Sequence, residues 1–217
     1  MEAVLFDLDN TLYDPKHDLF SLIDVRINRF MVEEVAIPVP EVDGLRRRYW
    51  RDYGATLQGL IRHHRVDPEA YLDYVHDVDI ASRIIPDERL QGSLAALDAP
   101  CHVFTNGSRE HATRVLDALG VGHHFTQIFD VRIAAYMPKP NPEPYRRVLE
   151  TLAADPRRCV MVEDSAANLV RARELGMKTV LVYGGTQESG FDLQVADAAA
   201  AAEAITQHFI LPREQAL

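Results

Sequence analysis

Residues 3–11 read AVLFDLDNT, an apolar run of strand length that ends in two carboxylates, Asp7 and Asp9. A continuous apolar run of this kind indicates a strand that is buried on both faces of a parallel sheet. Residues two apart on an extended segment project to the same side. Asp7 and Asp9 are therefore both expected to point into the crevice at the strand's carboxyl end, where open parallel sheets bind ligands. A single DxD pattern also occurs in solvated loops, so the other strand ends decide its meaning.

Three more apolar runs end in polar residues or glycine. The runs at residues 102–104, 160–162 and 179–183 are followed by Thr105-Asn106-Gly107, Glu163-Asp164 and Gly184-Gly185. Helical periodicity fills intervals between these runs, at residues 109–119, 144–152 and 166–175. A glycine follows the first and the last of these stretches, as expected for a helix stop. The alternation predicts an α/β fold with a parallel sheet and helices on its faces.

The segment at residues 15–85 interrupts this alternation, because it shows helical periodicity and no clear strand. We interpret it as a helical cap inserted into a core formed by residues 1–14 and 86–217. Its middle, residues 44–65, carries a cluster of arginines with one acidic residue, Asp52. The arginines are Arg46, Arg47, Arg48, Arg51, Arg62 and Arg65. Two interpretations of this cluster stay open, a solvated helix face and a positive lining above an anionic substrate. The Ala-rich residues 196–204 predict a terminal helix.

The 217-residue chain has a net charge of −10 at pH 7. Proteins that bind nucleic acids or membrane surfaces usually carry a basic footprint, so this charge argues against both partners. The sequence contains no bilayer-length apolar run and no basic signal-peptide start, which predicts a cytoplasmic protein. Cys101 and Cys159 lack zinc-ligand spacing and are expected to be buried thiols. The sequence leaves open whether the chain forms a homodimer.

The strand ends are expected to bring up to four carboxylates into one pocket: Asp7, Asp9, Glu163 and Asp164. Such a group needs a cation, because each unpaired buried ion costs several kcal/mol. Oxygen ligands without nearby His or Cys favour Mg²⁺. A metal and one lysine, Lys139, suffice for phosphoryl transfer. Asp7 then suits the role of nucleophile, and Asp9 that of acid and base.

Four stretches resemble, in order, the four motifs of the haloacid dehalogenase (HAD) superfamily: LFDLDNTLY at residues 5–13, VFTNGS at 103–108, MPKPNP at 137–142 and VEDSAANL at 162–169. The resemblance implies a Rossmann-like core, helices on both faces of the sheet, and a helical cap inserted after the first motif. It implies Asp7 as nucleophile and Asp9 as acid/base. It also implies Mg²⁺ held by Asp7, Asp164 and the Asp9 carbonyl, with Glu163 acting through water. The residues expected at the substrate are Thr11, Thr105, Asn106, Gly107 and Lys139.

A narrower resemblance is to the pyrimidine 5′-nucleotidase branch. The similar stretches are YGATLQGL at residues 53–60, YVHDVD at 74–79, KPNPEPYRRVL at 139–149 and EDSAANLVRARELGM at 163–177. That branch often carries two Asp where this chain has Glu163-Asp164. The resemblance implies a small phosphorylated metabolite as partner, a nucleoside 5′-monophosphate, with UMP and CMP preferred over purine nucleotides. Tyr53 could stack on the base, and Gln58 could hydrogen-bond to its edge.

Other functions stay open on the same motifs. A broad phosphatase for sugar phosphates or phosphoglycolate and a hexose-phosphate mutase share every core motif, whereas a catalytically silent ligand-binding or scaffold protein is a different class. A dehalogenase does not need the acid/base residue Asp9. A phosphonatase needs a cap lysine, but the lysines here are Lys16, Lys139 and Lys178. A silent protein has no evident reason to keep four carboxylates together, so the sequence favours a phosphatase.

Overall fold

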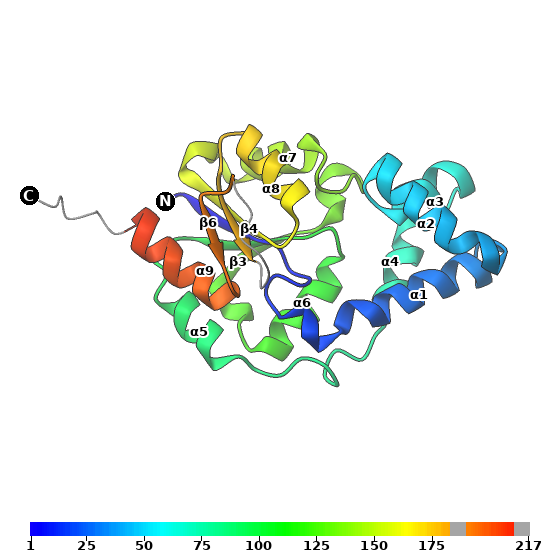
Figure 1. Cartoon of the computed structure of the whole chain (residues 1–217), viewed down its shortest axis with the longest axis horizontal. Helices are drawn as coiled ribbons and strands as arrows, with labels where there is room; N and C mark the ends of the chain where they lie inside the picture. Colours follow the sequence, from blue (N-terminus) through cyan, green and yellow to red (C-terminus); the bar gives the residue numbers. More distant parts are fainter. Residues whose placement is uncertain (183–189, 211–217) are drawn as a thin grey trace, which may run out of the picture.

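The computed structural model describes residues 1–182 and 190–210, and a six-stranded sheet lies at the centre of its larger part (Figure 1). The strands follow the order β3-β2-β1-β4-β5-β6, and every neighbouring pair is parallel. Their bounds are β1 Ala3–Phe6, β2 Cys101–Phe104, β3 Phe125–Phe129, β4 Cys159–Glu163, β5 Lys178–Val182 and β6 Leu193–Val195. This sheet confirms the predicted α/β, Rossmann-like fold class. The expected Gly184-Gly185 loop lies outside the described residues.

Helices cover both faces of the sheet. One layer consists of α5 Glu88–Ala95, α6 Arg109–Leu119 and α9 Ala198–Ile205, and the opposite layer of α7 Pro142–Leu152 and α8 Ala166–Glu174. Val4 and Phe6 of β1 pack with the first layer, while Ala3 and Leu5 pack with the second. A strand between two helical layers needs apolar side chains at every position, which explains the unbroken run at the start of the chain.

The predicted helical insertion forms a separate group of helices beside the sheet (Figure 1). It contains α1 Leu19–Glu33, α2 Val39–Tyr53, α3 Thr56–His64 and α4 Pro68–His76. Their inner faces share one apolar cluster, in which Phe30, Tyr49 and Leu60 are buried. Val131, which follows β3, also belongs to this cluster and connects the helices to the side of the sheet. The domain boundaries at residues 15 and 85 stay a prediction.

The structure contains elements that the sequence pattern did not indicate. β3, β6 and α5 were not predicted, and β1 ends at Phe6, directly before Asp7. The terminal helix and the helix at residues 109–119 are present, and Gly120 ends the latter with a φ of 75°. Both cysteines are free and buried. Within the two described ranges, no helix has the length and apolar character needed to cross a membrane.

Candidate active site

Lys139 joins three structural elements at the carboxyl edge of the sheet. Its Nζ donates hydrogen bonds to Asp7 Oδ1 at 2.8 Å, Glu163 Oε2 at 2.7 Å and the Phe104 carbonyl at 2.7 Å. The lysine is 1% exposed, and these three bonds use all its N–H groups. Burial alone would lower the pKa of Lys139, but the charges of Asp7 and Glu163 outweigh burial and raise it. The ammonium is therefore a fixed positive charge beside Asp7.

Asn106 holds the backbone that carries this lysine. Its Nδ2 donates to the Lys139 carbonyl at 3.1 Å, and its Oδ1 accepts from the Lys139 N–H at 2.7 Å. The sequence interpretation expected Asn106 at the phosphoryl group, whereas here both ends of its amide bind the lysine loop. Asn106 therefore positions Lys139 in this structure.

Thr11 links the first and fourth motifs. Its Oγ1 donates to Asp7 Oδ2 at 3.0 Å and accepts the Asp164 backbone N–H at 3.1 Å. Its distance to Asp164 Oδ1 is 3.4 Å. Because the threonine is 2% exposed, its contacts describe a brace between Asp7 and Asp164. The substrate-binding role expected for Thr11 stays a prediction.

Three of the four expected carboxylates meet at this point. Asp7, Glu163 and Asp164 each offer an oxygen, and these oxygens lie within 4.8 Å of one another. Burial, followed by the charge of Asp7, raises the pKa of Glu163 to about 8 and that of Asp164 to about 6. Burial also raises the pKa of Asp7, although Lys139 opposes it.

The three carboxylates of Asp7, Glu163 and Asp164 lie beside one positive charge, that of Lys139. When all three carboxylates are ionised, the single ammonium of Lys139 leaves two negative charges uncompensated. An all-oxygen donor set with this excess charge fits a hard divalent cation. Asp7, Glu163 and Asp164 are the residues that could hold it.

The fourth carboxylate, Asp9, is bound by a different set of residues. Its Oδ1 is 2.7 Å from the Tyr13 hydroxyl and 2.8 Å from His111 Nε2. Burial would raise the pKa of Asp9, but the charge and hydrogen bond of His111 and the hydrogen bond of Tyr13 lower it below its ordinary value. Asp7 and Asp9 therefore have distinct environments although they are two residues apart.

His111 was missed by the sequence reasoning. It lies on the buried face of α6 with Val115 and Leu119, in a position where the sequence pattern predicts only an apolar core residue. Its place three residues after Ser108, the residue that caps α6, is the signal that could have located it at the sheet edge.

Thr105 and Gly107 form the turn that leaves β2. The Gly107 N–H donates to Thr105 Oγ1 at 2.9 Å, and Thr105 is 1% exposed. A Cβ on Gly107 would come within 3.4 to 3.5 Å of Thr105, His111 and His76. The turn therefore lies directly against His76, the last residue of α4. The substrate-binding role expected for Thr105 and Gly107 stays a prediction.

The turn between α2 and α3 approaches the site from the helical insertion. Gly54 has a φ of 84°, and a Cβ there would lie 3.3 Å from Pro138 and 3.6 Å from the Lys139 carbonyl. The neighbouring Tyr53 bonds to His63 Nε2 at 2.8 Å, and Gln58 Nε2 donates to the Tyr136 carbonyl at 2.6 Å. Both side chains proposed for base recognition thus have partners within the protein.

The arginine cluster does not converge on the site. Arg46 forms an ion pair with Asp24, Arg51 pairs with Asp52, and Arg62 lies over the Tyr53 ring at 4.9 Å. Arg47 and Arg48 are exposed on α2. These contacts favour the interpretation of the cluster as a solvated helix surface.

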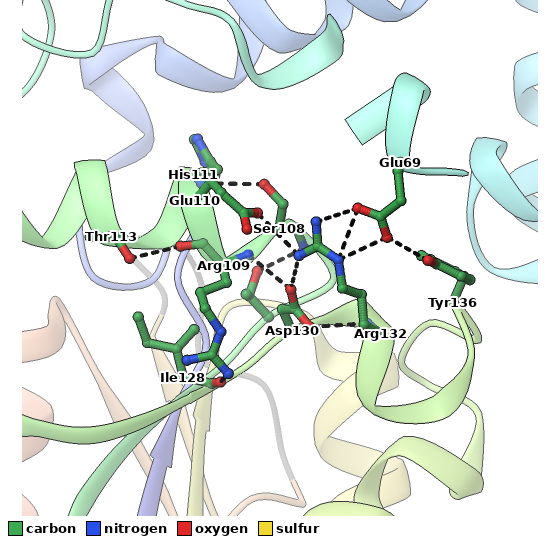
Figure 2. Close-up of polar contacts among 12 residues, drawn as sticks. Glu69, Ser108, Arg109, Glu110, His111, Thr113, Ile128, Asp130, Arg132 and Tyr136 are labelled. Carbon is green, nitrogen blue, oxygen red and sulfur yellow. Dashed lines mark hydrogen bonds and ion pairs between the residues drawn. The ribbon is translucent and has the colours of Figure 1, made fainter. Parts of the chain in front are cut away.

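Figure 2 shows a polar network that joins α4 to the residues after β3. Arg132 Nη2 donates to Glu69 Oε2 at 2.6 Å, and Arg132 also pairs with Asp130 and Glu110. The Tyr136 hydroxyl donates to Glu69. Arg132, followed by Tyr136, lowers the pKa of Glu69 to about 2. The network attaches the helical insertion to the edge of the sheet that carries the site.

Comparisons with known proteins identify the family of this chain. The family model of haloacid dehalogenase-like hydrolases matches residues 1–176. Phosphate metabolism protein 8 of Saccharomyces cerevisiae is 25% identical over 195 residues, which cover 83% of this chain and 61% of that protein. Phosphoglycolate phosphatase of Neisseria meningitidis is 28% identical over 203 residues, which cover 85% of this chain and 81% of that protein.

Solved structures share the fold over nearly the full length. A HAD phosphatase from Thermococcus onnurineus aligns with a TM-score of 0.63 at 17% identity, covering 95% of this chain and 97% of that one. L-2-haloacid dehalogenase from Xanthobacter autotrophicus aligns with a TM-score of 0.64 at 15% identity, covering 96% and 99%. The structural likeness supports the fold, and the family model covers most of the sequence. The chain therefore belongs to the haloacid dehalogenase-like hydrolases.

Proposed function

We propose that this hydrolase removes a phosphoryl group from a small phosphomonoester through a covalent intermediate on Asp7. The observation that carries the proposal is the pairing of a buried Asp7 with the Lys139 ammonium at 2.8 Å, beside the carboxylates of Glu163 and Asp164. This arrangement supplies a nucleophile, a fixed positive charge for phosphate oxygens, and a place for a cation.

The residues suit a two-step displacement. In the first step, an Asp7 oxygen forms a bond to phosphorus while the ester P–O bond breaks, and the protonated form of Asp9 gives its proton to the departing oxygen. In the second step, Asp9 takes a proton from water while the water oxygen bonds to phosphorus, and the bond to Asp7 breaks. The Lys139 ammonium beside Asp7 offsets negative charge on the phosphoryl group in both steps. The separate environments of Asp7 and Asp9 allow the two carboxylates to have different roles.

We propose Mg²⁺ as the cation, held by Asp7 and Asp164 with Glu163 beside them. A bound Mg²⁺ would neutralise charge on the phosphoryl oxygens. Mg²⁺ takes few protein carboxylates and keeps several waters, which suits a group of three carboxylates of which Glu163 is already bonded to Lys139. The Asp9 carbonyl stays in this proposal as a further ligand.

For the substrate, we propose first that the enzyme accepts small phosphorylated metabolites of several classes. The phosphoglycolate phosphatases among the relatives support it, and so do the internal partners of Tyr53 and Gln58, which leave those side chains less suited to a base. The pyrimidine nucleoside 5′-monophosphatase interpretation rests on the motif resemblance of the cap segment. A hexose-phosphate mutase would use the same core residues.

A phosphate-release assay separates these substrates. The kcat/KM values for UMP, CMP, AMP, phosphoglycolate and glucose 6-phosphate should show a spread without a pyrimidine lead if the broad class is correct. A pyrimidine lead that shrinks in Tyr53→Ala would favour the nucleotidase. Asp7→Asn should abolish release from every substrate. Retention of wild-type release by Asp7→Asn would overturn the covalent mechanism, and absence of release by the wild type would favour a silent protein.

A further inference from the structure

One oxygen of Asp9 receives two hydrogen-bond donors. The Tyr13 hydroxyl lies 2.7 Å and His111 Nε2 lies 2.8 Å from Asp9 Oδ1. Tyr13 is 4% exposed and His111 is 0% exposed, so neither donor can exchange its partner for bulk water in this arrangement. The two donors come from separate parts of the chain, because Tyr13 follows the first strand and His111 lies on α6.

Two donors on Oδ1 leave Oδ2 as the atom that can carry a proton. A carboxylate oxygen has two lone pairs, so two donors occupy the hydrogen-bonding capacity of Oδ1. A proton on Oδ1 would displace one of them and leave a buried donor without its partner, which is unfavourable. We propose that His111 and Tyr13 are positioning residues that direct proton transfer by Asp9 through Oδ2. This inference rests on the proposed phosphatase chemistry.

His111 is an orienting donor and does not continue a proton relay. Its Nδ1 is buried and has no hydrogen-bond partner in the described part of the chain. A relay would need a second group at that nitrogen. A hydrogen bond from Nε2 to the Asp9 carboxylate requires a proton on Nε2.

The ring of His111 is held by the helical insertion. His76, the last residue of α4, stacks on it with ring centres 4.5 Å apart and an angle of 13° between the planes. His76 Nδ1 lies 3.0 Å from the Ser108 hydroxyl. Figure 2 shows that the same hydroxyl accepts the His111 backbone N–H, at 3.2 Å. His111 is therefore fixed at its backbone and at its ring, as a positioning residue requires.

The competing explanation is that His111 is a buried polar residue that only stabilises the fold. Such a residue would change the amount of active protein or lower all rates equally. A residue that orients Asp9 should instead affect substrates according to how much their departing oxygen needs a proton. The acid matters most for a basic leaving group and least for an acidic one.

The test is a leaving-group series measured with Mg²⁺ present. The probes are 2,4-dinitrophenyl phosphate, 4-nitrophenyl phosphate and phenyl phosphate, and kcat/KM is the readout because it includes departure of the first leaving group. We expect His111→Leu and Tyr13→Phe to lower kcat/KM for phenyl phosphate at least about tenfold more than for the dinitrophenyl ester. His111→Gln, which keeps a donor, should recover part of the loss. His123→Gln, at an exposed histidine, is the matched control and should leave the series unchanged.

The test distinguishes failure of the positioning role from failure of the proposed phosphatase function. If the wild type hydrolyses none of the three esters, the phosphatase proposal itself is wrong. If the wild type is active but both variants lose activity equally across the series, the positioning role is overturned. Tyr13→Phe removes only a hydroxyl, so it tests the inference even if His111→Leu fails to fold. Circular dichroism at the assay temperature shows whether each variant is folded.

Discussion

At the residue scale, Lys139 is the side chain whose loss should change the site most, because it holds Asp7, Glu163 and the end of β2 together. Lys139→Met keeps an unbranched chain but leaves two buried carboxylates without their ammonium. Loss of a preorganised donor of this kind costs about 3 kcal/mol or more in the transition state. We therefore expect kcat/KM for any phosphate ester to fall at least about a hundredfold.

Lys16→Met is the control for that substitution, since Lys16 is an exposed lysine paired with Asp14. It should leave kcat/KM unchanged. A loss of about tenfold or less in Lys139→Met would show that the ammonium is peripheral to the reaction.

His76 should make the free energy of unfolding depend on pH. Burial, followed by the neighbouring His111 and Arg114 and opposed by Asp9, lowers the pKa of His76 to about 3. The folded state then binds fewer protons than the unfolded state between about pH 6.5 and pH 3. The free energy of unfolding should therefore fall as the pH drops through this window. His76 should contribute a loss on the order of 2 kcal/mol between pH 7 and pH 5.

Urea unfolding at pH 7 and pH 5 measures this effect. His76→Gln cannot titrate, so its free energy of unfolding should fall less between the two pH values than that of the wild type. An equal fall in both proteins would show that His76 does not contribute to the acid sensitivity.

The residue scale also shows which site residues a sequence can indicate. Asp7, Glu163, Asp164 and Lys139 were predicted because their chemistry is distinctive and each lies at the end of a strand, directly after one or in a proline-rich loop. His111 is 102 positions from Asp9, and only the packing of α6 against the first strand's loop brings them together. The hydrogen-bond partners of Asn106, Gln58 and Tyr53 lie in other elements of the same chain, so they likewise depend on tertiary packing.

At the element scale, the turn between α2 and α3 controls how closely the helical insertion approaches the lysine loop. Gly54 ends α2 in a left-handed conformation, and its missing Cβ leaves room for Pro138. Gly54→Ala adds a strained φ, which costs roughly 1 kcal/mol, and pushes against Pro138. We expect reduced stability and a lower kcat/KM, because the displaced loop carries Lys139.

Gly44→Ala is the matched control in the same helix. A Cβ at Gly44 meets nothing within 4 Å, and alanine is favoured over glycine in a helix by up to about 1 kcal/mol. Urea unfolding should therefore show Gly44→Ala more stable than the wild type, with kcat/KM unchanged. If Gly54→Ala behaves like Gly44→Ala, the turn does not constrain the catalytic loop.

The elements that escaped prediction share a physical reason. β3 lies at one edge of the sheet, where Thr126 and Gln127 are exposed, so its sequence lacks a continuous apolar run. β6, at the other edge, has three half-buried residues. The central strands are covered on both faces and are easily recognised. Burial on two faces, and not strand formation itself, is what the sequence pattern detects.

At the scale of the whole molecule, strand order explains why distant motifs meet. β1 lies between β2 and β4, so the residues after all three strands share one end of the sheet. The Asp7 N–H donates to the Val162 carbonyl at 2.9 Å, which places Asp7 directly beside the start of the fourth motif. Connections that leave a central strand in opposite directions create a crevice at this point. The α/β alternation predicts such a crevice, but not which helical segment covers it.

Metal binding by the three carboxylates in this crevice should change the stability of the whole fold. Asp7, Glu163 and Asp164 exceed the single charge of Lys139, so a cation that binds only the folded state should stabilise the protein. At a Mg²⁺ concentration of about 100 times its Kd, the gain in the free energy of unfolding is about 2.7 kcal/mol.

We expect added Mg²⁺ to raise the melting temperature of the chelator-treated protein, whereas NaCl of equal ionic strength should not. Asp164→Asn should reduce the rise, because it removes a carboxylate but keeps the size of the side chain. A melting temperature that does not respond to Mg²⁺, together with full activity in excess chelator, would show that the reaction is independent of the metal.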